Sequence, residues 1–164
     1  MISTDSAINL QSWSKTEKYD YAISSIYGVT SEEPNLIANL ANAVAILKEV
    51  FQWWWVGFYL VDSEELVLGP FQGPVACTRI AHGKGVCGTS WASKKSLIVP
   101  DVHLFPGHIA CSAVSNSEIV VPILRNSMVV AVLDVDSEFT DHFDETDRLQ
   151  LEKISAICAN WFSS

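Results

Sequence analysis

The fold of this chain is decided by residues 118–135, which read EIVVPILRNSMVVAVLDV. Two runs rich in β-branched residues, 118–124 and 128–135, flank the polar tripeptide Arg125-Asn126-Ser127. Runs of this kind favour strands, and a short polar turn between two of them is typical of an antiparallel hairpin. We therefore predict a β-hairpin over these residues.

Four further strands are predicted on the N-terminal side of this hairpin. The segment 53–61 is rich in aromatic and β-branched residues, and the polar turn 62–65 separates it from a second run at 66–71. Shorter strands are expected at 77–80 and at 97–99. Together with the hairpin they predict a sheet that is mainly antiparallel.

Helices are predicted before, within and after this set of strands. A first helix is expected over residues 16–27 and should stop at Gly28. A short helix should cover 89–93, after a glycine-rich turn at 83–88. The last helix should begin near Asp144, whose side chain suits an N-terminal cap.

The second helix has the clearest pattern of the four. Apolar residues recur at helical spacing from Leu36 to Phe51, which indicates one buried stripe. Ser31 and Glu33 are expected to cap its N-terminus. Pro34 suits the first turn, where a missing N–H costs nothing.

This order of elements predicts an α+β fold with an antiparallel sheet sandwiched by helices. A length of 164 residues suits one domain. We expect a flexible N-terminal segment at 1–14 and a single folded domain at 15–164.

Charge and composition restrict the partners. Ten basic and 19 acidic residues give a net charge of −9, which disfavours nucleic acids and anionic membranes. No apolar run approaches the ~20 residues of a membrane span, and no signal peptide is evident. We expect a cytoplasmic protein.

Metal and nucleotide motifs are not supported by the sequence. Residues 83–88, GKGVCG, match G-x-G-x-x-G but lack the preceding parallel strand and the acid ~20 residues later that a dinucleotide site needs. A tight turn before a helix is the better interpretation. The cysteines form no C-x-x-C pair, so we predict no metal site and no bound cofactor.

Three of the four cysteines lie in irregular segments. They are Cys77, Cys87 and Cys111, the last of them in a long loop at 101–117. Such thiols could be a nucleophile and its resolving partners, because a reactive thiolate needs access to solvent. Free cysteines are also often buried, and the residues alone leave both interpretations open. Cys158 falls on the apolar stripe of the last helix and is expected to be core.

Carboxyl groups gather near the end of the predicted hairpin. Strand alternation places Asp134 and Asp136 on one face with Val130 and Val132, and Glu118 begins the neighbouring strand. The three acids could converge on a pocket where a ligand ammonium neutralises them. Alternatively, the two aspartates are solvated residues at a strand end.

Aromatic residues crowd the start of the 53–61 segment. As strand residues, Trp53, Trp55 and Tyr59 would share a face, with Gly57 leaving space between them. Core packing is one interpretation of this group. A cage for a small methyl or sulfur group is the other.

Several blocks of the sequence resemble the free methionine-(R)-sulfoxide reductases, a family built on the GAF fold. These blocks are residues 69–80, 83–88, 100–103, 105–111, 117–122 and 133–137. They are long and specific, and the resemblance as a whole covers roughly residues 15–160. The resemblance implies a reductase that converts free L-methionine-(R)-sulfoxide to L-methionine.

The resemblance also implies roles for particular residues. Cys111 matches the nucleophile and Cys77 the resolving cysteine, with Cys87 an alternative disulfide partner. The expected chemistry passes through a sulfenic acid on Cys111 and an intramolecular disulfide. The substrate would be held by two groups of residues, the acids Glu118, Asp134 and Asp136 and the aromatics Trp55 and Tyr59.

Partners follow from the same resemblance. Thioredoxin would reduce the disulfide, so no resident redox cofactor is required, and a homodimer is expected. The proton donor is left open between Asp136 and Glu118. A GAF module that senses a small molecule without catalysis is the alternative function, and it predicts that Cys111 is dispensable.

Overall fold

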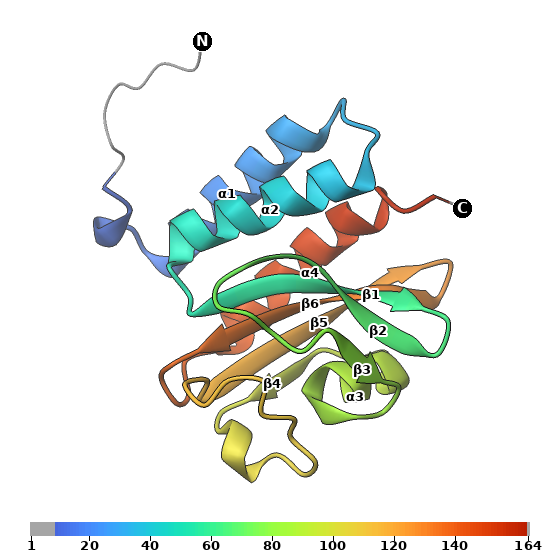
Figure 1. Cartoon of the computed structure of the whole chain (residues 1–164). Helices are drawn as coiled ribbons and strands as arrows, with labels where there is room; N and C mark the ends of the chain where they lie inside the picture. The colour runs from blue at the N-terminus through green and yellow to red at the C-terminus, as the bar shows by residue number, and fades with distance from the viewer. Residues whose placement is uncertain (1–8, 164) are drawn as a thin grey trace.

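A six-stranded sheet forms the middle layer of the molecule (Figure 1). The computed structural model describes residues 9–163. The sheet order is β3-β2-β1-β6-β5-β4, and each neighbouring pair is antiparallel. The strands are β1 (Trp55–Asp62), β2 (Glu65–Gln72), β3 (Arg79–Ala81), β4 (Leu97–Val99), β5 (Ser117–Arg125) and β6 (Met128–Ser137).

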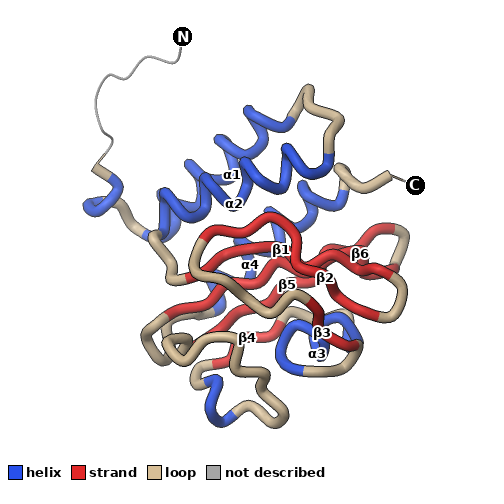
Figure 2. Tube along the Cα trace, viewed as in Figure 1, coloured by secondary structure: helices blue, strands red, loops and turns tan. Residues whose placement is uncertain are grey.

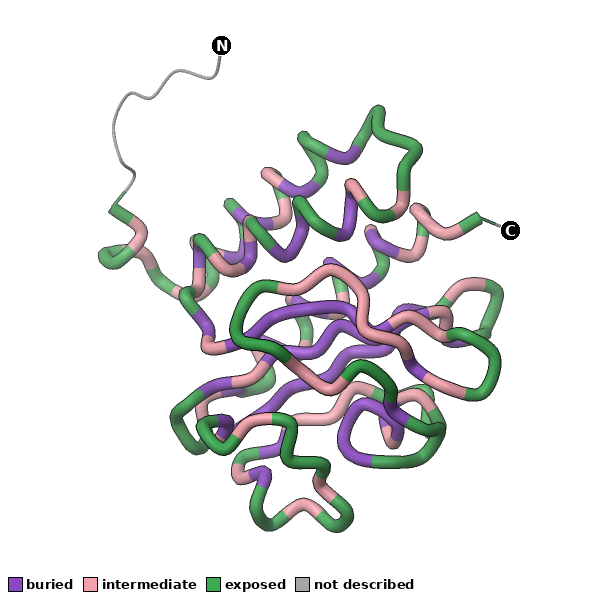
Figure 3. The backbone as a smooth tube through the Cα atoms, in the orientation of Figure 1, coloured by how far each residue is buried: buried purple, intermediate pink, exposed green. Residues whose placement is uncertain are grey.

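Helices cover both faces of this sheet, which confirms the predicted α+β sandwich (Figures 1 and 2). On one face pack α1 (Lys15–Thr30), α2 (Leu36–Phe51) and α4 (Glu145–Ala159). On the other face lies α3 (Gly85–Ser93) with the long loop before β5. Each face buries its own apolar cluster, so the strands β1, β5 and β6 are mostly buried, whereas β2 and β3 are only partly covered (Figure 3).

The predicted hairpin is confirmed as β5 and β6. Its turn is formed by Asn126 and Ser127, with φ of 50° and 65°, and positive φ at both positions is typical of a tight hairpin. A register shift follows Ile123, where the chain pairs Leu124 with Val129. Val130 therefore packs against the cluster of the α1, α2 and α4 face, and the prediction that it shares a face with Asp134 was wrong.

Two predictions about helix ends were also wrong. Helix α1 continues through Gly28 to Thr30, because a glycine inside a helix costs only about 1 kcal/mol and Thr30 is buried. Helix α2 is capped by Asn35, which accepts a 3.0 Å hydrogen bond from the Ala38 N–H. Ser31 and Glu33 therefore do not cap it.

Trp53 lies on the opposite face of the sheet from the one predicted. It precedes β1 and stacks on Phe51 with ring centroids 4.2 Å apart, in the cluster beneath α2. Trp55 and Tyr59 pack in the cluster of the α3 face, as β1 alternation requires. The strand begins two residues later than predicted, so Trp53 does not follow its alternation.

The helical layer is joined by buried polar contacts. Asp144 caps α4 with a capping box, as predicted. The Tyr19 hydroxyl of α1 donates a 2.7 Å hydrogen bond to buried Asp147 of α4, and Lys15 forms ion pairs with both aspartates. Cys158 is fully buried in this layer, as expected of a core residue.

At the N-terminal end, the predicted flexible segment 1–14 lies partly outside the described residues, which begin at Asn9. Residues Leu10–Ser12 form one turn of 3-10 helix, and Leu10 packs against the core. The Trp13 ring meets the ring of Tyr21 edge to face. None of the described helices is long and apolar enough to cross a membrane.

Candidate active site

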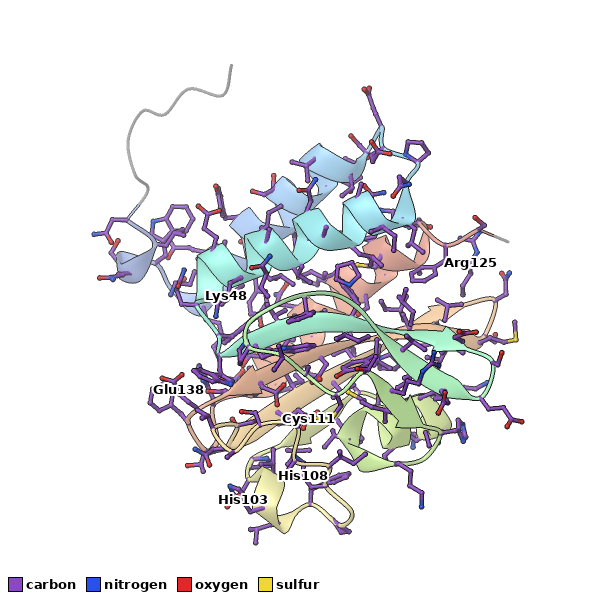
Figure 4. The ribbon with its side chains drawn as sticks, viewed as in Figure 1. Lys48, His103, His108, Cys111, Arg125 and Glu138 are labelled. Carbon is purple, nitrogen blue, oxygen red and sulfur yellow. A yellow bond between two sulfur atoms is a disulfide. The ribbon has the colours of Figure 1, made fainter. Side chains whose placement is uncertain are left out.

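A cavity of about 60 Å³ opens on the α3 face of the sheet. Its walls combine aromatic side chains of β1, acidic side chains of β5 and β6, the start of α3 and the long loop. Most of the residues predicted for the site line it, namely Trp55, Tyr59, Cys87, Cys111, Glu118, Asp134 and Asp136. Cys111 and His108 lie on the side of the sheet away from α1 and α2 (Figure 4).

A disulfide between Cys77 and Cys111 lies beside this cavity. The two Cα atoms are 5.4 Å apart, although 34 positions separate the residues in the sequence. Cys111 is exposed and lines the cavity, whereas Cys77 is half-buried in the segment between β2 and β3. The structure thus pairs the two cysteines that the family resemblance implied as nucleophile and resolving partner.

The aromatic residues of β1 hold the segment that carries Cys77. The Trp55 indole N–H donates a 3.1 Å hydrogen bond to the Pro74 carbonyl oxygen, and the Tyr59 hydroxyl donates one of 2.8 Å to the Cys77 carbonyl oxygen. Gly73 adopts a φ of 140°, and a Cβ there would lie 2.6 Å from the Trp55 ring. The two rings therefore serve both as cavity walls and as supports for Cys77.

The loop that carries Cys111 is fixed at both of its ends. Near its start, the Val102 N–H donates to the Asn116 carbonyl oxygen at 3.0 Å. Near its end, the Asn116 N–H donates to the Ser137 carbonyl oxygen at 2.8 Å. Between these points Ile109 packs closely over Gly85, where a Cβ would lie only 3.2 Å from its side chain. The loop therefore packs against the end of β6 on one side and against the start of α3 on the other.

Three carboxyl groups converge on the floor of the cavity. Glu118 faces Asp136 across the β5–β6 pair, and Asp134 lies two residues along on the same face. Glu118 and Asp134 are buried and hydrogen-bonded to each other, yet Asp134 Oδ1 has no partner. The interpretation of the aspartates as solvated strand-end residues was therefore wrong, because β6 extends past them to Ser137.

Burial and crowding keep these carboxyl groups protonated to higher pH than usual. Burial, followed by repulsion from neighbouring acids, raises the pKa of Glu118 and of Asp134 well above the ordinary range. Burial also raises the pKa of Asp136 to about 6, against the lowering effect of a 2.6 Å hydrogen bond from Ser115. A cation in the cavity would favour the charged form of all three.

Cys87 is the third thiol at this site and remains reduced. It lies in the first turn of α3, is buried, and has its Sγ 3.9 Å from Oε1 of Glu118. Burial, followed by the negative charges of Asp134 and Glu118, raises the pKa of this thiol well above its usual range. A thiol in these surroundings is a poor nucleophile at neutral pH.

The glycine-rich stretch 83–88 leads into α3, as predicted, but the helix begins at Gly85 rather than at residue 89, so Cys87 lies in the helix and not in an irregular turn. Strand β3 before it pairs antiparallel with β2, so the parallel strand of a dinucleotide site is missing from this part of the described chain. A Cβ on Gly88 would lie 2.5 Å from the Ala81 carbonyl oxygen. This glycine is therefore required by close backbone packing.

Several residues of the cavity were not predicted as site residues, and three of them have polar or aromatic side chains that bear on its chemistry. Ser115 contacts Asp136, and Trp54 and His108 also line the walls. Ser115 and His108 belong to the long loop, whose residues have no strand or helix period that predicts a direction. Trp54 precedes β1, so strand alternation does not predict which face of the sheet its side chain occupies.

The side chains of the cavity restrict both the ligand that it can bind and the reaction that it can support. Buried acids on the floor would neutralise a ligand cation, and aromatic rings beside them would accept an apolar or sulfur-containing group. A disulfide lies at the wall, where a bound molecule can reach Cys111. The cavity is suited to a small cationic ligand and to thiol–disulfide chemistry.

Comparison with known proteins agrees with this description. A family model of the GAF domain matches residues 35–160. The chain is 54% identical over 154 residues to GAF domain-containing protein A of Dictyostelium discoideum, covering 93% of this chain and 98% of that protein. It is 43% identical over 143 residues to the free methionine-R-sulfoxide reductase of Escherichia coli (strain K12), covering 87% of each.

Solved structures support the same relationship. The free methionine-R-sulfoxide reductase of Neisseria meningitidis, whose crystal structure contains its substrate, superposes with a TM-score of 0.90. That protein is 51% identical to this chain, and the match covers 92% of this chain and 91% of the other. The chain belongs to the GAF-domain proteins and, among them, to the free methionine-R-sulfoxide reductase family.

Proposed function

We propose that this protein reduces free L-methionine-(R)-sulfoxide to L-methionine, with Cys111 as nucleophile and Cys77 as resolving cysteine. The observation that carries the proposal is the disulfide between these residues beside a cavity floored by buried acids. Relatives at 43% and 51% identity that are named for this activity support it.

Substrate selection follows from the charge of the cavity floor. The ammonium group of a free amino acid would neutralise Glu118 and Asp134 and give Asp134 Oδ1 its missing partner. A methionine sulfoxide within a peptide has an uncharged amide at that position. It would leave the acids without a cation, so the free amino acid is preferred. The methyl and sulfur end then lies against Trp55 and Tyr59.

The reaction transfers one oxygen atom to the enzyme. The Cys111 thiolate attacks the sulfoxide sulfur, while a protonated carboxyl group donates to the sulfoxide oxygen. In the resulting adduct the hydroxyl group passes to the Cys111 sulfur as the S–O bond and the new S–S bond break, so methionine leaves reduced and Cys111 becomes a sulfenic acid. The Cys77 thiol condenses with that sulfenic acid, forming the S–S bond and releasing water.

Asp136 is suited to the role of proton donor. A pKa of about 6 allows it to be protonated in part of the molecules near neutral pH and to regain its proton quickly. Glu118 is the second candidate, with a pKa raised further by burial and by the charge of Asp134.

Thioredoxin is the proposed reductant of the disulfide. Because Cys111 is exposed, an external dithiol can attack the bond without unfolding of the domain. We place the reaction in the cytoplasm, where such dithiols are kept reduced. No resident cofactor is proposed, since the cysteines carry the electrons.

A coupled assay tests this function. NADPH, thioredoxin reductase and thioredoxin are supplied with free methionine-R-sulfoxide, free methionine-S-sulfoxide or a peptide-bound sulfoxide. NADPH consumption with the free R form alone is expected. If the folded, reduced protein turns over none of the three, a GAF module that senses a small molecule becomes the better interpretation.

The homodimer expected from the family resemblance stays a prediction. Light scattering on the purified protein measures the mass directly. A mass twice the 18.1 kDa of one chain would agree with the prediction.

A further inference from the structure

Three possible metal ligands meet at one point in the active-site cavity. They are the Sγ of Cys87 and one carboxylate oxygen each from Glu118 and Asp134, and all lie within 4.8 Å of one another. Each of the three residues is buried. The cysteine spacing alone predicted no metal site, because the two acids that meet Cys87 lie far from it along the chain.

The three groups are held by separate, rigid elements. Cys87 lies in α3, Glu118 in β5 and Asp134 in β6. The register of β5 and β6 places Val120 opposite Asp134, so Glu118 is the diagonal neighbour of Asp134 on the same face. The fold itself therefore brings the three groups together.

The described residues that line the cavity bring little positive charge to this cluster. Among the residues that line the cavity, His108 is the only basic one, and burial lowers its pKa. Asp134 Oδ1 is buried and has no hydrogen-bond partner among the described atoms. An unpartnered carboxylate oxygen beside a thiol can ligate a metal ion as well as accept a hydrogen bond from an ammonium group.

We propose that the substrate-free protein binds one borderline-soft divalent cation, Zn²⁺ or Cd²⁺, through Cys87, Glu118 and Asp134. A thiolate with two carboxylates is a donor set for such an ion, whereas Mg²⁺ and Ca²⁺ prefer oxygen ligands alone. Three protein ligands leave a fourth position toward the cavity.

Binding requires the Cys87 thiol to lose its proton to solvent, so each bound ion should release protons. The affinity should consequently rise from mildly acidic to mildly alkaline buffer. The ion and the substrate ammonium need the same two carboxylates. They should therefore exclude each other, a consequence that rests on the proposed function.

This site differs from the structural zinc centre that the cysteine spacing argued against. The fold is already held by two apolar clusters, and the proposed ion lies in an open cavity. We therefore expect the ion to be exchangeable and the metal-free protein to stay folded.

The experiment uses the oxidised protein, in which Cys77 and Cys111 are blocked by their disulfide. The free cysteines of the described chain are then Cys87 and Cys158. Co²⁺ is titrated as a spectroscopic probe, and Zn²⁺ binding is measured by equilibrium dialysis. We expect one equivalent of metal, a thiolate-to-Co²⁺ charge-transfer band, and displacement of Co²⁺ by Zn²⁺ but not by Mg²⁺.

Matched variants locate the ion. Cys87→Ser and Glu118→Gln should lose the bound equivalent, and Cys87→Ser should also lose the charge-transfer band. Cys158→Ala removes the other buried thiol, which lies in the opposite apolar cluster, and should retain both signals. Circular dichroism and thermal unfolding check that each variant is folded.

Several results would overturn the proposal. They are absence of a bound equivalent in the folded wild-type protein, full binding by Cys87→Ser, or equal displacement by Mg²⁺. These readouts need no substrate turnover, so they separate failure of the metal site from failure of the reductase function. Free methionine-R-sulfoxide is then added to the metal-loaded protein, and release of Zn²⁺ to a chromogenic chelator measures the competition.

Discussion

The Tyr59 hydroxyl donates a hydrogen bond of 2.8 Å to the backbone carbonyl oxygen of Cys77, 18 residues later in the chain. Tyr59 is buried in β1, at the middle of the sheet, whereas Cys77 lies in an irregular segment between β2 and β3. The bond therefore fixes one disulfide cysteine relative to the rigid part of the fold. Burial is the main reason that the pKa of this phenol is raised, so the hydroxyl remains a donor at any physiological pH.

Tyr59→Phe should slow disulfide formation after the first turnover. Loss of this hydrogen bond should cost about 1 kcal/mol and let the Cys77 segment move away from Cys111. A larger fraction of the sulfenic acid should then be trapped by a dimedone-type reagent in a single turnover. Tyr27→Phe is the matched control, because Tyr27 is exposed and remote from the cavity. Equal trapping in Tyr59→Phe and wild type would contradict the supporting role.

Replacing single cysteines should separate the two chemical steps. Cys111→Ser should form no methionine, because no thiolate reaches the sulfoxide. Cys77→Ser should release about one methionine per chain and stop at the sulfenic acid, since its resolving partner is absent. Mass spectrometry and product quantification in a single-turnover experiment measure both. If Cys87→Ser instead stops after one turnover and Cys77→Ser does not, the resolving role belongs to Cys87.

Asp136→Asn should stabilise the protein at alkaline pH. The folded-state pKa of Asp136 is about 6, against an ordinary value of 3.8, so above pH 3.8 the unfolded state loses this proton first. The cost to the folded state grows as the pH rises to about 6 and then stays near 3 kcal/mol. Urea unfolding should therefore show the variant gaining more at about pH 8 than at about pH 5.

The same substitution should impair the reaction. An amide cannot donate the proton in the proposed mechanism, so turnover should fall by roughly 10²–10⁴-fold. In wild type, turnover should decline as the pH rises through about 6, where Asp136 loses its proton. A pH–rate profile of Asp136→Asn that keeps this decline would assign the donor to another group, with Glu118 as the next candidate.

Gly57→Ala should disturb the aromatic wall of the cavity. A Cβ at Gly57 would lie 2.5 Å from the Phe71 Cβ and 2.5 Å from the Trp55 ring, so the stacked rings must move. We expect a loss of about 1–3 kcal/mol in the free energy of unfolding, together with a raised KM. Gly28→Ala, inside α1 with open space around it, should be stabilising by about 0.5–1 kcal/mol. Thermal unfolding of both variants makes the comparison.

The sequence by itself determined the layers of this fold. Strand alternation and the polar turn at 125–127 predicted the β5–β6 hairpin, and helical spacing predicted the buried stripe of α2. These features depend on contacts between residues a few positions apart, which a local pattern reports. The carboxyl cluster was accessible in the same way, because Asp134 and Asp136 alternate on one strand and Glu118 begins its neighbour.

Only the tertiary structure decided which site residues are brought into contact and how the pKa values of their acidic groups are shifted. The register shift after Ile123 turns the Val130 side chain to the face opposite Asp134. Because β1 starts later than predicted, Trp53 lies on the face opposite Trp55 and Tyr59. The pairing of Cys77 with Cys111 depends on the meeting of two irregular segments, and the contact of Ser115 with Asp136 depends on the long loop lying against β6. The raised pKa values of Glu118 and Asp134 arise from burial and from repulsion by neighbouring acids of β5 and β6. Burial and charge repulsion act through space, and a linear sequence records neither until the chain is folded.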